Sequence, residues 1–285
     1  MKKYIKHLVA VITLITSFGA NAQNDSSLLW EISGNGLNKS SYIFGTIHMI
    51  CQDDYIMTPV IENTLESVDN YYAEIDFTNI PDLLLMQESL KSEIPLSKRI
   101  SVEDYTKLTK LLNENFQMNI SNFEYSSLAA LVSMITFKSF PCDQHKMYEM
   151  ELLQMASKSN KKMGGLETMK EQLDIMNNSF DIKAIISMLE DFKTKGFEST
   201  NQMVKLYKEQ RIEDLLNLMN ESTYMTEETN ETMLNKRNHN WIAKMPEIMK
   251  DKSTFFAVGA AHLGGKNGVI SLLKEKGYQV TPIKL

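Results

Sequence analysis

Two Gly-x-x-His motifs contain the residues whose types and spacing best suit metal binding or catalysis. The first motif ends at His48 and the second at His262, and each follows an apolar run typical of a β-strand. In open α/β sheets, ligands bind beyond the carboxyl ends of the strands, where these histidines would lie. The glycine of each motif, Gly45 or Gly259, lets a neighbouring backbone or a bound group approach closely. Because neutral imidazole is the commonest protein metal ligand, the pair of motifs indicates a metal site.

A carboxylate that fits the same site lies in a third strand-like run, residues 71–77. Glu74 stands within this run, and Asp76 shares its face because side chains alternate along a strand. An acid in so apolar a strand is costly unless it is paired or binds a cation, the alternative being a solvent-facing position on an edge strand. Two histidines and a carboxylate suit a catalytic divalent metal with positions open to water and substrate. The sequence therefore predicts that His48, Glu74 and His262 are the metal ligands.

The two ends of the chain carry the strands that must position these residues. Residues 28–32 and 41–47 flank turn-forming residues and predict a hairpin, and a helix is expected to begin at Pro59 after Thr58. The C-terminal segment predicts a strand, a glycine-rich loop, a helix ended by Gly277 and a closing strand, at residues 254–258, 259–265, 267–276 and 278–283. A strand–helix–strand unit implies a parallel pair in a sheet.

The middle of the chain has helical periodicity. It runs over residues 81–159 and again over 168–246, with a brief strand and turn at 161–166. We therefore predict an α/β fold: a mixed sheet built from the N- and C-terminal segments, with a large helical insertion at about residues 80–250. About 260 residues after residue 22 suffice for one large domain, over residues 23–285.

The first 22 residues have the layout of a secretory signal peptide. Lysines open the chain, an apolar run follows, and Ala20 and Ala22 mark a cleavage site before Gln23. The apolar run is short for a membrane span, which needs about 20 residues, so an uncleaved anchor is the weaker alternative. We expect an exported protein, periplasmic or extracellular, with no stable membrane insertion after cleavage. The net charge of −6 offers no basic footprint and excludes nucleic acid as a partner.

The chain has two cysteines, Cys51 and Cys142. In an exported protein an even pair favours a disulfide over two free thiols. This bond would tie the loop after the first histidine motif to the helical middle of the chain.

The sequence resembles the TraB/GumN family along nearly its whole length after the leader. The matching segments are residues 29–34 (LWEISG), 44–48 (FGTIH), 165–168 (GLET) with Glu171 and Gln172, Arg237 and Asn238 with Trp241, and 258–265 (VGAAHLGG) with Gly268, Leu273, Gly277 and Tyr278. This family includes the Tiki proteins, which are metal-dependent proteases that act on Wnt ligands. The resemblance implies that the paired motifs and a strand glutamate, here Glu74, form a metal centre that works with manganese or cobalt.

Two further residues are candidates for catalysis. Glu167 follows a glycine turn and would act as a general base or an additional ligand, whereas Glu171, one helical turn on, is as well explained by capping a helix. Arg237 lies on a long helix four residues before Trp241 and would stabilise a developing oxyanion, or would instead form an ion pair between the insertion and the sheet.

These residues favour a metal-dependent hydrolase acting on peptide or protein substrates. The cation would be Mn²⁺, Co²⁺ or Zn²⁺ and would activate water, with Glu167 moving the proton and Arg237 holding the oxyanion. The alternative is an extracytoplasmic binding module for a metal complex, haem or peptide, without catalysis. A haem binder requires neither Glu74 nor Glu167, which favours the hydrolase. A structural or accessory role, in which the histidines are core groups, is the third possibility.

Overall fold

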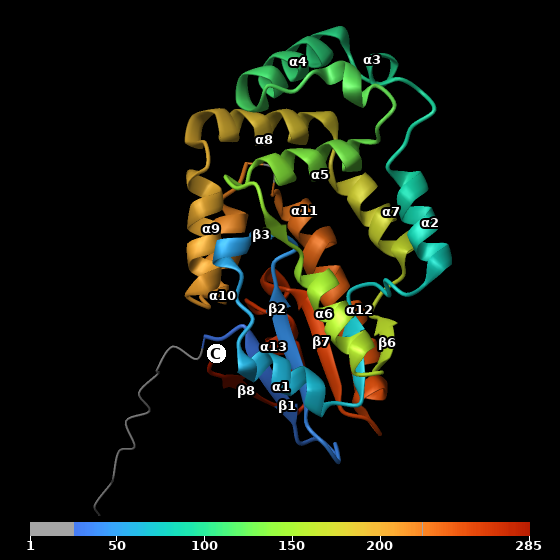
Figure 1. Ribbon diagram of the computed structural model, residues 1–285, viewed down its shortest axis with the longest axis vertical. Helices are drawn as coiled ribbons and strands as arrows, with labels where there is room; N and C mark the ends of the chain where they lie inside the picture. The colour runs from blue at the N-terminus through green and yellow to red at the C-terminus, as the bar shows by residue number, and fades with distance from the viewer. Residues whose placement is uncertain (1–25, 224) are drawn as a thin grey trace, which may run out of the picture.

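The computed structural model describes residues 26–223 and 225–285. It is built around a six-stranded mixed sheet with spatial order β6-β4-β7-β2-β1-β8. The strands are β1 (Leu29–Ser33), β2 (Ser41–Thr46), β4 (Asn70–Ala73), β6 (Lys162–Gly165), β7 (Thr254–Gly259) and β8 (Gln279–Ile283). Strands from both ends of the chain lie side by side in this sheet (Figure 1), as predicted. The proposed signal peptide lies outside the described residues.

The predicted hairpin and the helix after it are confirmed. β1 pairs antiparallel with β2, and Leu29 lies opposite Phe44. Helix α1 (Pro59–Ser67) has Pro59 in its first turn, and the Thr58 hydroxyl accepts a hydrogen bond from the backbone N–H of Ile61. This cap satisfies one of the N–H groups that a helix start leaves without a partner.

The four strands β6, β4, β7 and β2 are parallel neighbours, so their carboxyl ends lie on one edge of the sheet. The C-terminal strand–helix–strand unit is present as β7, α13 (Val269–Glu275) and β8, and Gly277 has a positive φ of 92°. Its two strands run in the same direction in one sheet, as expected, but they do not pair with each other. β8 pairs with β1, because the hairpin formed by β1 and β2 occupies the position beside β7.

β4 is shorter than the predicted strand at residues 71–77. It ends at Ala73, and Glu74 lies in the bend that follows, although its carbonyl still accepts a 2.8 Å hydrogen bond from the backbone N–H of Glu167. Asp76 does not share a face with Glu74, because the chain turns away there. Its carboxylate instead accepts bonds from the backbone N–H and hydroxyl of Thr78.

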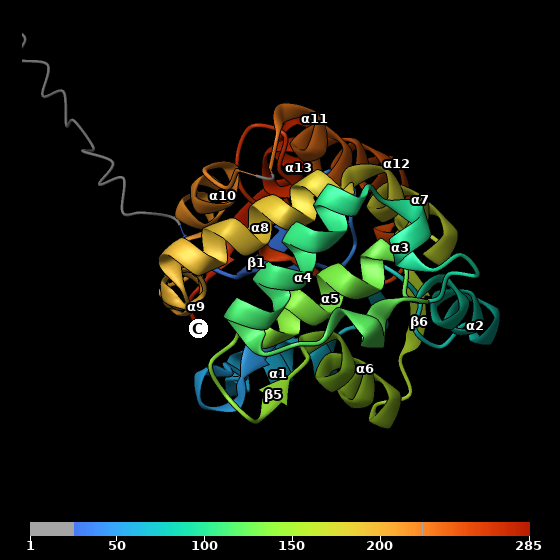
Figure 2. The same ribbon diagram turned by 90° about the horizontal axis from the view of Figure 1, so that it is seen from above.

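Helices make up the middle of the chain and form a second core. They are α2 (Ile80–Ser89), α3 (Leu96–Arg99), α4 (Val102–Phe116), α5 (Leu128–Lys138), α6 (Tyr148–Lys158), α7 (Met169–Ser179), α8 (Ile182–Lys195), α9 (Glu198–Lys208), α10 (Ile212–Asn220), α11 (Glu227–Asn230) and α12 (Lys236–Met249). Helices α4, α5 and α8 contribute most of the buried residues of the second core. They lie beyond the carboxyl ends of β2 and β7 (Figure 1) and cover the sheet when it is seen from above (Figure 2).

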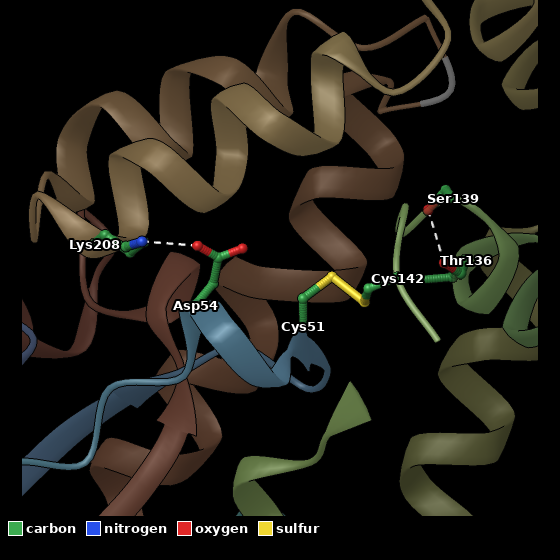
Figure 3. Close-up of a disulfide and its surroundings, with 6 residues drawn as sticks. All are labelled: Cys51, Asp54, Thr136, Ser139, Cys142 and Lys208. Carbon is green, nitrogen blue, oxygen red and sulfur yellow. Dashed lines mark hydrogen bonds and ion pairs between the residues drawn. A yellow bond between two sulfur atoms is a disulfide. The ribbon is translucent and has the colours of Figure 1, made fainter. Parts of the chain in front are cut away.

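A disulfide ties the first histidine loop to the helical region. Cys51 and Cys142 are bonded, with their Cα atoms 5.9 Å apart (Figure 3). Cys51 belongs to the short strand β3 (Ile50–Cys51), which pairs antiparallel with β5 (His145–Lys146). Near this disulfide, Asp54 pairs with Lys208 at 2.7 Å. The expected bond is therefore present, and it joins two elements that both lie next to the candidate site.

Within residues 26–223 and 225–285, no helix has the combination of length and apolarity that a bilayer crossing requires.

Candidate active site

The predicted site residues follow the carboxyl ends of four adjacent parallel strands. In the spatial order of the strands, Glu167 comes after β6, Glu74 after β4, His262 after β7 and His48 after β2. Ligand sites of open α/β sheets lie at this edge. The fold therefore brings to one edge of one sheet four side chains that are up to 214 residues apart in the sequence.

Gly45 allows the two histidine motifs to pack against each other. A Cβ added there would lie 2.8 Å from a methyl carbon of Leu263 and 3.0 Å from the Cα of Ala260. The short 3₁₀ turn that carries His262 (Ala260–His262) therefore sits directly on the backbone of β2. A side chain at Gly45 would occupy the space that the second motif fills, which explains why the first motif has a glycine at this position.

Arg237 lies at the centre of the site and is 5% exposed. Its Nε and Nη2 bind the Glu167 carboxylate, Nη2 also binds Glu74 at 2.6 Å, and Nη1 contacts His262 Nε2 at 3.1 Å. The carbonyl of Met233 accepts the remaining Nη1 bond at 3.0 Å. All five N–H groups of the guanidinium thus have protein acceptors. Arg237 follows a π-helical segment (Glu231–Asn235), a distortion that is frequent at functional sites.

Glu74 is buried and remains ionised. One carboxylate oxygen accepts a 2.8 Å bond from the backbone N–H of Gly259, and the other accepts from Arg237 and Gln172. Burial alone would raise the pKa of Glu74, but the charges of Arg237 and the two motif histidines, with the Gly259 hydrogen bond, together outweigh it, so the pKa lies well below its usual range. The carboxylate oxygen bound to Gly259 is 3.8 Å from His262 Nε2.

His262 is buried as a neutral imidazole. Its Nδ1 lies 2.6 Å from the side-chain oxygen of Asn238, and its ring stacks on Trp241 with centroids 4.4 Å apart. Burial, with the positive charge of Arg237, lowers the pKa of His262 to about 3. Because the amide oxygen of Asn238 accepts and Arg237 donates, Nδ1 carries the proton and Nε2 the lone pair.

We expect His262 to make the protein sensitive to acid. Its folded-state pKa of about 3 lies below its unfolded value, so the unfolded chain takes up a proton first as the pH falls. The free energy of unfolding should fall by about 1 kcal/mol per pH unit below pH 6, near the limit of about 1.4 kcal/mol for one proton. Urea unfolding of His262→Gln should show a smaller decrease between pH 6 and pH 5. Equal decreases in wild type and variant would contradict the assignment.

His48 faces solvent, with 72% of its side chain exposed. Its Nδ1 lies 2.7 Å from Oε1 of Glu149, a residue of helix α6. The negative charge of Glu149 is the main cause that raises the pKa of His48 to about 9, and the charge of Glu74 adds to it. The charge of His48 in turn lowers the pKa of His262. The two motif histidines are therefore electrostatic neighbours, one exposed and one buried.

Glu167 and Glu171 have different positions. Glu167 is buried, and its carboxylate accepts hydrogen bonds from Arg237, from the indole N–H of Trp241 at 3.1 Å and from Gln172. Glu171 forms a capping box with Thr168 at the start of α7, which explains it structurally. Only Glu167 belongs to the network of Arg237.

The donor set fits a divalent cation in part. Ligand bonds of about 2.0–2.2 Å place two ligands of one ion within roughly 4.3 Å of each other, so His262 Nε2 and Glu74 are close enough to share one. Both motif histidines have Nδ1 held by an oxygen, the arrangement that orients imidazole ligands. In the part of the chain that the structure describes, no three His, Cys, Asp or Glu side chains converge on one point. Binding would therefore require Arg237 to release His262 Nε2 and His48 to turn its Nε2 inward.

Three residues of this network were not assigned a role from the sequence. Glu149 holds His48, Asn238 holds His262, and Gln172 bridges Glu74 and Glu167. Asn238 and Gln172 belong to the segments that carry the family resemblance, which was the available signal. Glu149 lies in a helical stretch with no distinguishing spacing.

Comparison with known proteins identifies the family of the chain. Neither the curated proteins nor the solved structures gave a match to the chain. Residues 28–282 match the TraB/PrgY/gumN family, which is most of the sequence and includes every site residue described above. The chain belongs to the TraB/PrgY/gumN family.

Proposed function

We propose that the protein is an exported metal-dependent hydrolase that cuts peptides or proteins. The observation that carries this proposal is the row of side chains at the ends of four parallel strands, in which a buried, ionised carboxylate is followed by two oriented histidines on the next two strands. His48, Glu74 and His262 would hold Mn²⁺, Co²⁺ or Zn²⁺. When bound, such a cation supplies Lewis acidity and activates water for attack on a carbonyl.

The surrounding residues would orient the ligands and stabilise charge. Asn238 keeps the lone pair of His262 on Nε2, and the Gly259 N–H holds one oxygen of Glu74. Nη1 of Arg237 contacts His262 Nε2. When Nε2 binds the cation instead, this Nη1 N–H would be available to donate to a developing oxyanion. Glu167, bound to the same guanidinium, is our proposed proton-transfer group.

Two other observations support export and a large substrate. A disulfide between Cys51 and Cys142 is typical of proteins outside the cytoplasm. The side chain of His48 is exposed to solvent, which leaves it accessible to a large substrate. Helices α4, α5 and α8 lie beyond the strand ends, where they would form the wall that selects a substrate. Peptide as the substrate class follows from the resemblance to the Tiki proteins.

The test is a combined measurement of metal content and peptide cleavage on the purified protein. We expect the wild type to bind one divalent ion and to lose cleavage with chelator. His48→Ala and His262→Ala should weaken binding by at least the roughly 10–100-fold that loss of a supporting partner causes. Lys39→Ala, which removes an exposed ion pair with Asp69, is the control and should behave as wild type.

Retention of metal and cleavage by both histidine variants would refute the proposed site. Metal binding without cleavage of a broad peptide library would favour a binding module instead.

A further inference from the structure

The side chain of Glu149 forms hydrogen bonds with two residues at the end of β2 and just beyond it. Its Oε1 lies 2.7 Å from His48 Nδ1 and 3.4 Å from the hydroxyl of Thr46. Its side chain is 13% exposed, although that of His48 is 72% exposed. Among the described residues, no lysine or arginine pairs with this carboxylate, and its Oε2 is buried without a hydrogen-bond partner. Among the described residues, the ion-pair partner of Glu149 is therefore His48.

The hydrogen bond from His48 determines which of its nitrogens is available as a ligand. A carboxylate oxygen can only accept, so Nδ1 of His48 must carry the proton. The other nitrogen, Nε2, is then the one that can act as a ligand. Metal-binding histidines are oriented in this way by a carboxylate on the second nitrogen.

Pairing between neighbouring backbone segments holds His48 and Glu149 close together. His48 is followed by β3, and Glu149 lies in the first turn of α6, which follows β5. β3 and β5 pair with each other, and the neighbouring Tyr148 hydroxyl bonds to both the N–H and the carbonyl of Ile56 at 2.9 Å. The position of Glu149 relative to His48 is therefore set by main-chain pairing.

We propose that Glu149 is a positioning residue that holds His48 by Nδ1 and so leaves Nε2 as its ligand nitrogen; this role rests on the proposed metal-dependent function. Glu149 acts through His48 and does not bind the ion itself. It is the counterpart of Asn238, which holds the second motif histidine in the same way.

Glu149→Ala and Glu149→Gln test this role, with Glu151→Gln as the matched control. Glu151 lies on the same helix but pairs with Lys146 instead. In calorimetric titration of the full chain with Mn²⁺, Glu149→Ala should bind about 10–100-fold more weakly than wild type. Glu149→Gln should lose less, because its amide oxygen still accepts from Nδ1, and Glu151→Gln should match wild type. Urea unfolding of each variant verifies that it folds.

A second readout does not depend on metal. In the metal-free wild type and in Glu151→Gln, the His48 Nδ1 proton should give a hydrogen-bonded NMR signal, and Glu149→Ala should lose it. If the wild type binds no ion, the proposed function fails and this signal alone decides whether Glu149 orients His48.

Two results would overturn the inference. One is an unchanged His48 signal in Glu149→Ala. The other is a further loss of Mn²⁺ affinity when Glu149→Ala is added to His48→Ala, since Glu149 would then bind the ion directly. No further loss in the double variant supports action through His48.

Discussion

Replacement of Arg237 by methionine is expected to lower the free energy of unfolding by about 3–5 kcal/mol, the usual effect of removing one partner from a buried ion pair. The variant leaves Glu74 and Glu167 buried, 6% and 8% exposed, without their shared cation. Methionine fills a similar volume, so the lost charge and hydrogen bonds dominate over any cavity. Urea denaturation at neutral pH, followed by circular dichroism, measures the change.

The matched control for this prediction is Arg211→Met. Arg211 pairs with Glu209 and Asp214 on the surface, where its side chain is 46% exposed. Surface pairs of this kind contribute about 0–1 kcal/mol, so this variant should stay close to wild type. Adding Glu74→Gln and Glu167→Gln to Arg237→Met should restore part of the stability, because both buried charges are then removed. An Arg237→Met protein as stable as Arg211→Met would show that the two carboxylates do not depend on Arg237.

The second large effect is expected from loss of the disulfide. Cys51 and Cys142 are separated by 91 residues, and a bond that closes so long a loop removes much of the entropy of the unfolded chain. The double variant Cys51→Ala/Cys142→Ala should unfold with about 2–5 kcal/mol less free energy than the oxidised wild type. Urea midpoints with and without a reducing agent give the comparison.

The reducing agent should shift the wild type to the midpoint of the double variant and leave the double variant unchanged. A wild-type midpoint that does not respond to reduction would mean that the two thiols are not bonded in the native protein. Because the bond joins β3, which follows His48, to the loop that leads into β5 and Glu149, its loss should also broaden the His48 Nδ1 signal.

The strands and their ends were predictable because they depend on local patterns. Apolar runs and turn residues located β1, β2, β6 and β7, and the rule that ligands bind at carboxyl ends brought His48, Glu74 and His262 together. The family resemblance covered the same segments. The mixed α/β class follows from strands at both ends and helices between them.

The rest depends on packing that no local pattern encodes. Glu149 reaches His48 across 101 residues, and only the pairing of β3 with β5 places it there. The early end of β4 follows from a turn at Glu74 that its β-favouring sequence does not show. The position of β8 beside β1 is determined by the hairpin, which fills the place next to β7.

The roles of Glu167 and Arg237 in proton transfer and oxyanion binding stay predictions. Their contacts give them a second role as an ion pair between α12 and the sheet, which was the alternative for Arg237.

The position of β7 also determines when the site forms. β7 is near the C-terminus in sequence but lies between β4 and β2 in the sheet, so the two halves of the site meet only through it. A chain still emerging from the ribosome has His48 and Glu74 but lacks both the strand that joins them and the second histidine. Contacts between β2 and β7 join residues that are 213 positions apart, such as Tyr42 and Phe255, and would form late and slowly. For the hydrolase proposed above, this order of assembly would withhold activity until the whole chain is available.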